Sequence, residues 1–146
     1  GLVPPSGGGT TKALYSDGTW KEVPTITGGW YVGGVSVVSG TVSNVNLSTL
    51  HYQRVGTVVH VTGFFTFTMA STSAVLSLTL PVASTFQGLQ DVTGTLTVQP
   101  NTGTATAANG HMQNQDGGTQ AQLWVDKATS SSETMRADFT FMYLIR

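Results

Sequence analysis

Hydrophobic and polar residues alternate most regularly between Leu50 and Ser84, as they do in strands that bury one face. Residues Leu50–Val55 and Val58–Thr68 form two alternating runs, which Gly56-Thr57 separates. A glycine at the first central position favours a type II′ turn, whose twist matches that of a hairpin. We therefore predict an antiparallel hairpin here. The residues predicted to face each other are Val55 and Val58, Gln53 and His60, and Tyr52 and Val61.

Two further runs extend the same pattern. Residues 75–80 alternate and end at Pro81, which has no N–H to donate to a neighbouring strand, and residues 134–146 alternate over their whole length. The side chains predicted to face the core are Val59, Val61, Phe65, Phe67, Leu76, Leu78, Leu80, Met135, Ala137, Phe139, Phe141, Tyr143 and Ile145. Those predicted on the outer face include Val75, Ser77 and Thr79.

The rest of the chain predicts shorter elements. Residues 85–90 leave room for no more than one helical turn, and residues 100–110 read as a long loop or a poorly formed edge. Short strands are expected within Trp30–Val38, Thr41–Leu50, Asp91–Val98 and Ala121–Val125. Because the strands are many and no segment has helical periodicity, we predict an all-β fold, an antiparallel β-sandwich or jelly roll.

Several strands also carry large apolar residues on the predicted outer face. Scattered singly, such residues need no explanation, but together they indicate a buried interface between copies of the chain. The alternative is a sandwich with an irregular outer face. The interface candidates are Val58, Phe64, Met142 and Leu144, and Trp124 shares the pattern.

Composition narrows the possible functions. The 146 residues fit one domain, charged residues make up only 9%, and the net charge is −1, so nothing suggests nucleic acid or an anionic membrane as partner. Ser and Thr supply roughly a quarter of the residues, which predicts a neutral, hydroxyl-rich surface. There is no cysteine, and no segment is long and apolar enough to enter a membrane. The chain does not begin with Met, so we expect a fragment or a processed form.

The first forty residues differ from the rest. They are rich in glycine and proline, with Pro4-Pro5 followed by Gly7 to Gly9 and a predicted turn at Asp17-Gly18. We expect residues 1–40 to form a short extended neck and residues 41–146 to form the folded domain. The neck is either a flexible linker or the junction with a long shaft.

Five segments occur in an order that resembles the C-terminal receptor-binding heads of bacteriophage tail fibres. They are YQRVGTVVHVTG, LSLTLPVASTF, GHMQNQ, QAQLWVD and ADFTFMYLI, within residues 41–146. The opening segment, which contains DGTW, is similar to the linkers that precede such heads. The resemblance implies an all-β homotrimeric head at the tip of a fibre on the virion. It further implies a shaft on the N-terminal side and adhesion to a bacterial surface as its function.

The ionisable residues do not predict an enzyme. Most of the carboxylates adjoin Gly, Ser or Thr in expected turns, where they serve as solvated caps. His51, His60 and His111 lack the spacing of a preformed metal site. Three copies of His60 or His111 around a three-fold axis would be one way to bind a metal, but ordinary hydrogen-bonded histidines are favoured. We expect no catalytic residue, no metal and no cofactor.

Receptor contacts are expected where aromatic and amide side chains occur together, because aromatic faces stack on sugar rings and amides reach their hydroxyls. Each candidate also has a packing alternative, in the neck, in the interface or in a strand and turn. The candidates are Trp30, Tyr31, His111, Gln113, Asn114, Gln115, Asp116 and Trp124.

Three functions remain open at this point. The first is a trimeric adhesion head that binds a bacterial surface glycan or an outer-membrane protein. The second is a structural knob on a fibre, capsid or collar that forms trimers without binding a receptor. The third is a monomeric carbohydrate-binding module. Oligomeric state separates the third from the first two, and binding to cells separates the first from the second.

Overall fold

The computed structural model describes residues 12–24, 26–101, 108–114 and 117–146. The chain is all-β, and every strand pair is antiparallel. The helical segment in this part of the chain is one 3-10 turn, η1 (Leu89–Asp91). None of its helices is long and apolar enough to cross a bilayer.

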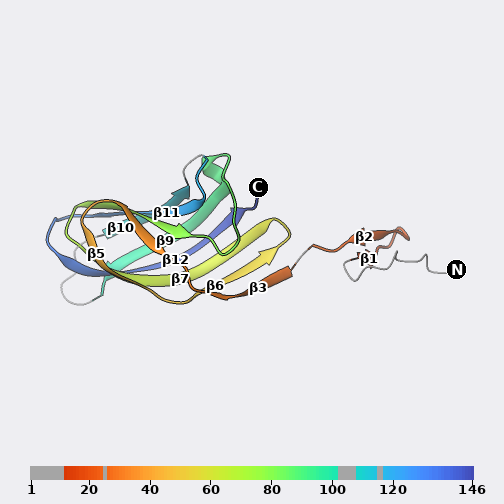
Figure 1. The fold of residues 1–146 in the computed structure, drawn as a ribbon, viewed down its shortest axis with the longest axis horizontal. Coiled ribbons are helices and arrows are strands. Elements are labelled where there is room, and N and C mark those ends of the chain that lie inside the picture. The colour runs from red at the N-terminus through yellow and green to blue at the C-terminus, as the bar shows by residue number, and fades with distance from the viewer. Residues whose placement is uncertain (1–11, 25, 102–107, 115–116) are drawn as a thin grey trace.

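The strands form one hairpin and two larger sheets (Figure 1). The hairpin pairs β1 (Lys12–Leu14) with β2 (Trp20–Glu22). The four-stranded sheet has the order β10-β11-β8-β4, and the six-stranded sheet has the order β3-β6-β7-β12-β9, with β5 also paired to β7. The bounds are β3 (Ile26–Tyr31), β4 (Val35–Ser39), β5 (Val42–Leu47), β6 (Leu50–Val55), β7 (Val58–Met69), β8 (Ser73–Thr79), β9 (Val92–Pro100), β10 (Ala108–Asn114), β11 (Gln120–Lys127) and β12 (Glu133–Leu144).

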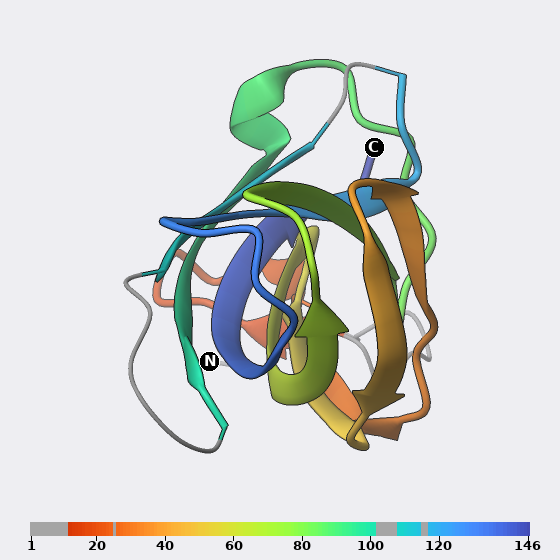
Figure 2. The same ribbon diagram turned by 90° about the vertical axis from the view of Figure 1, so that its left-hand side faces the viewer.

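The two larger sheets lie as two layers around one core, as the end-on view in Figure 2 shows. Strand β12 lies between β7 and β9 and pairs with β7 from Glu133 opposite Met69 to Leu144 opposite Val58. The core faces predicted for β7 and β12 are confirmed, because their alternate side chains are buried. The predicted leucines Leu76 and Leu78 are buried as well, and Leu80 and Ile145 are partly buried against the core.

The predicted hairpin is confirmed in position and register. Val55 faces Val58, Gln53 faces His60, and Tyr52 faces Val61. Gly56 has a φ of +60°, and the next residue, Thr57, does not have a positive φ. This combination is that of a type II′ turn, since a type I′ turn requires positive φ at both central residues.

Val75 and Ser77 lie on the face of β8 opposite to Leu76 and Leu78, as predicted, but both are buried. Val75 lies opposite Trp124 on the neighbouring strand, and the Ser77 hydroxyl lies 2.7 Å from the Ser36 hydroxyl of β4. Side chains of the neighbouring strands β11 and β4 thus shield these two residues from solvent.

The sheets begin at Ile26, within the segment 1–40 that was predicted to form the neck. Strand β3 pairs with β6, and β4 pairs with β8, so both belong to the two-sheet body. The segment 100–110 also contains more strand than expected, because β9 runs to Pro100 and β10 begins at Ala108. Residues 102–107 lie outside the described residues.

The β1–β2 hairpin lies beyond one end of the two-sheet body (Figure 1). Its turn is at the predicted Asp17-Gly18, where Gly18 has a φ of +79° and donates its N–H to the carbonyl of Tyr15 at 2.9 Å. Asp17 also accepts a hydrogen bond of 2.7 Å from Lys21. This ion pair and the hydrogen bonds from Thr19 lower the pKa of Asp17.

Candidate functional site

The predicted receptor contacts separate into groups that lie on different sheets. His111, Gln113 and Trp124 come together on the outer face of the four-stranded sheet, on β10 and β11. Trp30 lies on β3, in the six-stranded sheet. Gln115 and Asp116 lie outside the described residues. The first group is therefore the one that can form a single site.

A groove of about 360 Å³ crosses the outer face of the four-stranded sheet. Small-ligand pockets typically enclose roughly 300–1,000 Å³, so this groove is at the small end of the range. The side chains that shape it are Val38 from β4, Val75 from β8, Gln113 from β10, Gln122 and Trp124 from β11, and Leu89 from η1.

Trp124, the aromatic residue of the groove lining, stacks on the ring of His111 beside the groove. The indole of Trp124 and the imidazole of His111 lie nearly parallel, with an interplanar angle of 16° and centroids 5.7 Å apart. Cross-strand pairing places these residues directly opposite each other. The indole Nε1 of Trp124 is buried and has no hydrogen-bond acceptor in the described part of the chain. A buried donor of this kind is normally satisfied by an ordered water.

Two amides lie beside this pair. Gln113 and Gln122 face each other across β10 and β11, one step along the strands from His111 and Trp124. Both side chains are half-buried, and neither amide makes a hydrogen bond with the described residues. Each amide keeps two donor hydrogens and a carbonyl acceptor available.

Asn114, another of the predicted receptor contacts, lines the same groove but is fully buried. Its side chain points inward because it shares the inner face of β10 with Met112. Its Nδ2 donates to the carbonyl of Gly88 at 2.8 Å, next to η1. Asn114 therefore holds the loop that carries Leu89 against β10.

Trp30 and Tyr31 are neighbours with different environments. Trp30 is 73% exposed and contacts the ring of His51 edge-on, with centroids 5.0 Å apart. Tyr31 turns toward the core, where its ring meets that of Tyr52 and its hydroxyl donates to the carbonyl of Thr79 at 3.3 Å. Burial raises the pKa of Tyr31 above its usual range. Tyr31 thus packs within the fold, and Trp30 faces outward.

The four interface candidates lie on one surface, the outer face of the six-stranded sheet. Their strands β7 and β12 pair so that Leu144 faces Val58. The register extends this surface to β6 and β3, because Val55 faces Val58 and also Ile26. We call the whole set the apolar face. It consists of Ile26, Trp30, Val55, Val58, Phe64, Met142 and Leu144.

Charge is nearly absent from the outer positions of β3, β6, β7, β12 and β9. The charged side chains there are Arg136 and Asp138, which pair with each other through Nη2 and Oδ1 at 2.7 Å. This pairing raises the pKa of Arg136. The guanidinium also lies over the ring of Phe64, 4.0 Å from its centroid. The pair is therefore satisfied within one chain.

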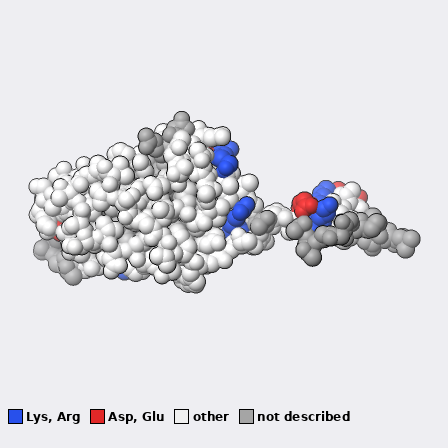
Figure 3. Space-filling view, in the orientation of Figure 1, with Lys and Arg blue, Asp and Glu red and all other residues white. Residues whose placement is uncertain are grey.

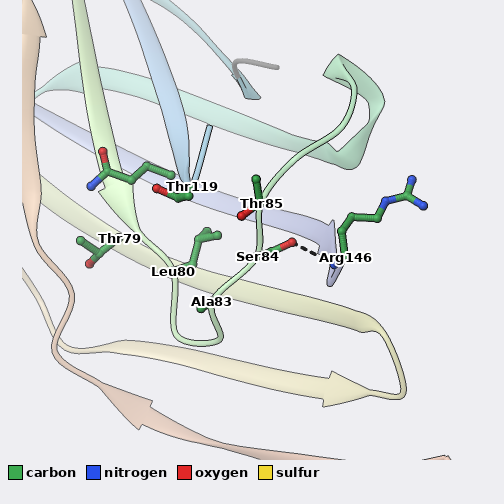
Figure 4. Close-up of a pocket in the computed structure, with 8 residues that line it drawn as sticks. Thr79, Leu80, Ala83, Ser84, Thr85, Thr119 and Arg146 are labelled. Atoms are coloured by element: carbon green, nitrogen blue, oxygen red, sulfur yellow. Dashed lines mark hydrogen bonds between the residues drawn. The ribbon is translucent and has the colours of Figure 1, made fainter. Parts of the chain in front are cut away.

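A second hollow opens where β8 leaves the four-stranded sheet (Figure 4). Its lining is mostly small and hydroxylic, from Thr79, Ser84, Thr85 and Thr119, together with Arg146. The guanidinium of Arg146 is held by Asp91, with Nη2 and Oδ1 2.6 Å apart, and its backbone N–H donates to the Ser84 hydroxyl at 3.1 Å. The hydrogen bonds that Arg146 donates to Asp91 are the main reason why the pKa of this carboxylate is lowered. This hollow offers no free charge for a ligand.

The described residues hold no group of three or more His, Asp or Glu placed to bind a metal ion. Within the same residues, Asp17, Asp91 and Asp138 are each engaged by a basic side chain.

The fold defines the class of this chain as an all-β protein with two antiparallel sheets around one core and a groove on the smaller sheet. Comparison with protein-family models, with curated proteins and with solved structures finds no match.

Proposed function

We propose that this protein is the receptor-binding head at the tip of a bacteriophage tail fibre. In this proposal it is a non-enzymatic, jelly-roll-like homotrimer that attaches the virion to a glycan or protein on the bacterial surface. The observation that carries the proposal is the apolar face, which is exposed on the single chain and nearly free of charge. The sequence resemblance to tail-fibre heads supports the same function.

The apolar face is suited to contact identical copies. It gathers exposed, large apolar side chains such as Trp30, Val55 and Met142 on one sheet, and exposed apolar groups of this kind mark contact sites between proteins. A charge buried without a partner would oppose association, but Arg136 and Asp138 already neutralise each other within one chain. A neighbouring copy therefore meets apolar and hydroxyl groups and no unpaired charge.

The remaining surface is suited to exposure on a virion. On the face shown in Figure 3 the two-sheet body is almost uncharged, and charged side chains gather on the β1–β2 hairpin and at the adjoining end of the body. The groove lies on the other sheet from the apolar face, so association through the apolar face leaves the groove open. Three grooves on one head would bind a cell surface multivalently, which turns weak contacts into firm attachment.

The test is a change of one residue on the apolar face. Phe64→Asp places a second carboxylate beside Asp138, its partner across the strands, on the surface proposed to be buried. We expect a folded monomer by light scattering where the unchanged protein is a trimer, together with loss of binding to intact bacteria. The matched control is Gln120→Asp, which adds the same charge to the outer face of the opposite sheet and should leave the trimer intact.

The alternatives give different results in the same measurements. A monomeric unchanged protein would contradict the trimeric head and favour a carbohydrate-binding module. A trimer that binds none of a broad panel of bacterial strains would favour a structural knob. If Phe64→Asp still formed trimers, the apolar face would not be the interface between the copies.

A further inference from the structure

The groove on the four-stranded sheet combines a half-buried aromatic face with apolar walls. Trp124 contributes its indole, and Val75 beneath the groove is buried. Leu89, from η1, and Val38, from β4, lie at the sides and are 62% and 55% exposed. A surface of this kind favours a ligand with a flat, weakly polar face, such as the C–H face of a pyranose ring.

The polar groups of the groove are neutral and available. The amides of Gln113 and Gln122 lie side by side across two strands and make no hydrogen bond with the described residues. Each amide can donate to one hydroxyl and accept from another, as paired vicinal hydroxyls require. The indole Nε1 of Trp124 is buried, so Trp124 offers a ligand the face of its ring rather than a hydrogen-bond donor.

The groove lining contains no Lys, Arg, Asp or Glu. An anionic sugar, such as a uronate or a sialic acid, would lose water around its carboxylate there without gaining a cationic partner. An ammonium group would likewise find no carboxylate. The lining therefore selects for an uncharged ligand.

From these three features we propose that the groove binds an uncharged saccharide through stacking on Trp124 and hydrogen bonds to Gln113 and Gln122. The biological setting of this inference rests on the proposed adhesive function, since it specifies the class of receptor.

The probe is a panel of immobilised polysaccharides in which uncharged glucans, mannans and galactans are paired with polyuronates and sialylated glycans. We expect the full-length protein to bind at least one uncharged member, with an affinity that does not change between low and high salt. Gln113→Ala and Gln122→Ala should each weaken that binding about three- to tenfold, because each removes one set of hydrogen bonds.

Trp124→Ala should weaken the same binding by more than about tenfold, since it removes the stacking surface. If this variant fails to fold, the two glutamine variants carry the test, because their amides make no hydrogen bond within the described chain. The matched control is Gln120→Ala, which removes the same amide from the same face of β11, two residues outside the groove. It should bind like the unchanged protein.

Three results would overturn the inference. They are binding to no uncharged polysaccharide, binding only to acidic members with a strong salt dependence, and binding that the groove variants do not change. If all groove variants still attached to bacteria, the groove would not be the receptor site, but the adhesive function would stand. A further outcome is that the protein binds a saccharide, loses this binding in the groove variants, and attaches to no bacteria. This outcome would support the groove as a saccharide site and contradict the adhesive function.

Discussion

Gly63 lies on the core face of β7, where the other inward side chains are large. A Cβ at this position would lie 2.1 Å from Cδ2 of Leu50 and 3.2 Å from Cζ of Phe139. Leu50 is fully buried, so it has no free space into which it can move. The missing side chain is thus a packing requirement, and the gap that Gly63 leaves in the alternation is filled by Leu50 from β6.

We predict that Gly63→Ala lowers the free energy of unfolding by about 1–3 kcal/mol, the usual cost of overpacking a core. Urea denaturation measures the change. The control is Gly29→Ala, also in a strand, where an added Cβ meets no atom within 4 Å. Equal effects of the two substitutions would contradict the packing argument.

Tyr143 connects the end of β12 to the loop after β8. Its hydroxyl donates to the carbonyl of Val82 at 2.7 Å and accepts from the N–H of the same residue at 3.1 Å. The ring packs edge-on against Phe86. Burial raises the pKa of Tyr143 to about 12. The neutral phenol, which can both donate and accept, is therefore the form that the folded chain requires.

The predicted consequence is a loss of stability in alkali. Because the pKa is raised on folding, the contribution of Tyr143 is complete below its unfolded pKa of about 10 and is lost as the pH rises toward about 12. Tyr143→Phe should lower the free energy of unfolding by about 1–3 kcal/mol near neutral pH, because it leaves the backbone groups of Val82 without their partner. Denaturation curves at several pH values should show a smaller alkaline loss in the variant. An unchanged alkaline loss would refute this assignment.

At the scale of elements, alternation along β7 places one set of side chains in the core and the other set on the outer face of the sheet. Phe65 is fully buried among core side chains, while its neighbour Phe64 is 37% exposed on the apolar face. We predict that Phe65→Asp abolishes folding, because a buried carboxylate finds no partner there. Circular dichroism and solubility measure the outcome. A folded Phe65→Asp protein would contradict the core assignment, whereas Phe64→Asp is expected to fold.

The β6–β7 hairpin could be predicted together with its register because the residues that determine it are close together in the sequence. A two-residue turn with glycine fixes which residues face each other, and period-two alternation then fixes both faces. Strands β3 and β4 lack such signals. Gly28-Gly29 interrupts β3, and most side chains of β3 and β4 are exposed, so their place in the sheets depends on partners distant in sequence.

The groove was only partly predictable, because its lining residues are brought together by strands that are distant in sequence. Trp124 and Gln113 were recognisable as an aromatic and an amide, the types that bind sugars. Leu89 and Val38 gave no such signal, since their role arises from the pairing of β4 with β8 and from the position of η1. Asn114 was recognisable as an amide too, but its burial was not predictable, because alternation along β10 could not be read without knowing where that strand begins.

At the scale of the whole molecule, low charge determines how copies can associate. With 9% charged residues and a net charge of −1, contact between chains depends on apolar area rather than on ion pairs. We predict that the mass in solution, measured by light scattering, stays that of a trimer from low salt to molar sodium chloride. Sodium sulfate should not dissociate it either, because excluded salts favour apolar burial. Dissociation as salt rises would indicate that ion pairs hold the assembly.

The position of β12 also bears on how the molecule is made. This strand lies between β7 and β9, yet it follows both of them along the chain. A nascent polypeptide that has not yet supplied it leaves two bare strand edges facing each other, with their hydrogen-bonding groups unsatisfied. Cooperative closure of the larger sheet must therefore wait for β12 to emerge from the ribosome, and such distant pairings close slowly. Until then the unfinished chain is vulnerable to aggregation, and this interval is when a chaperone would be of most use to it.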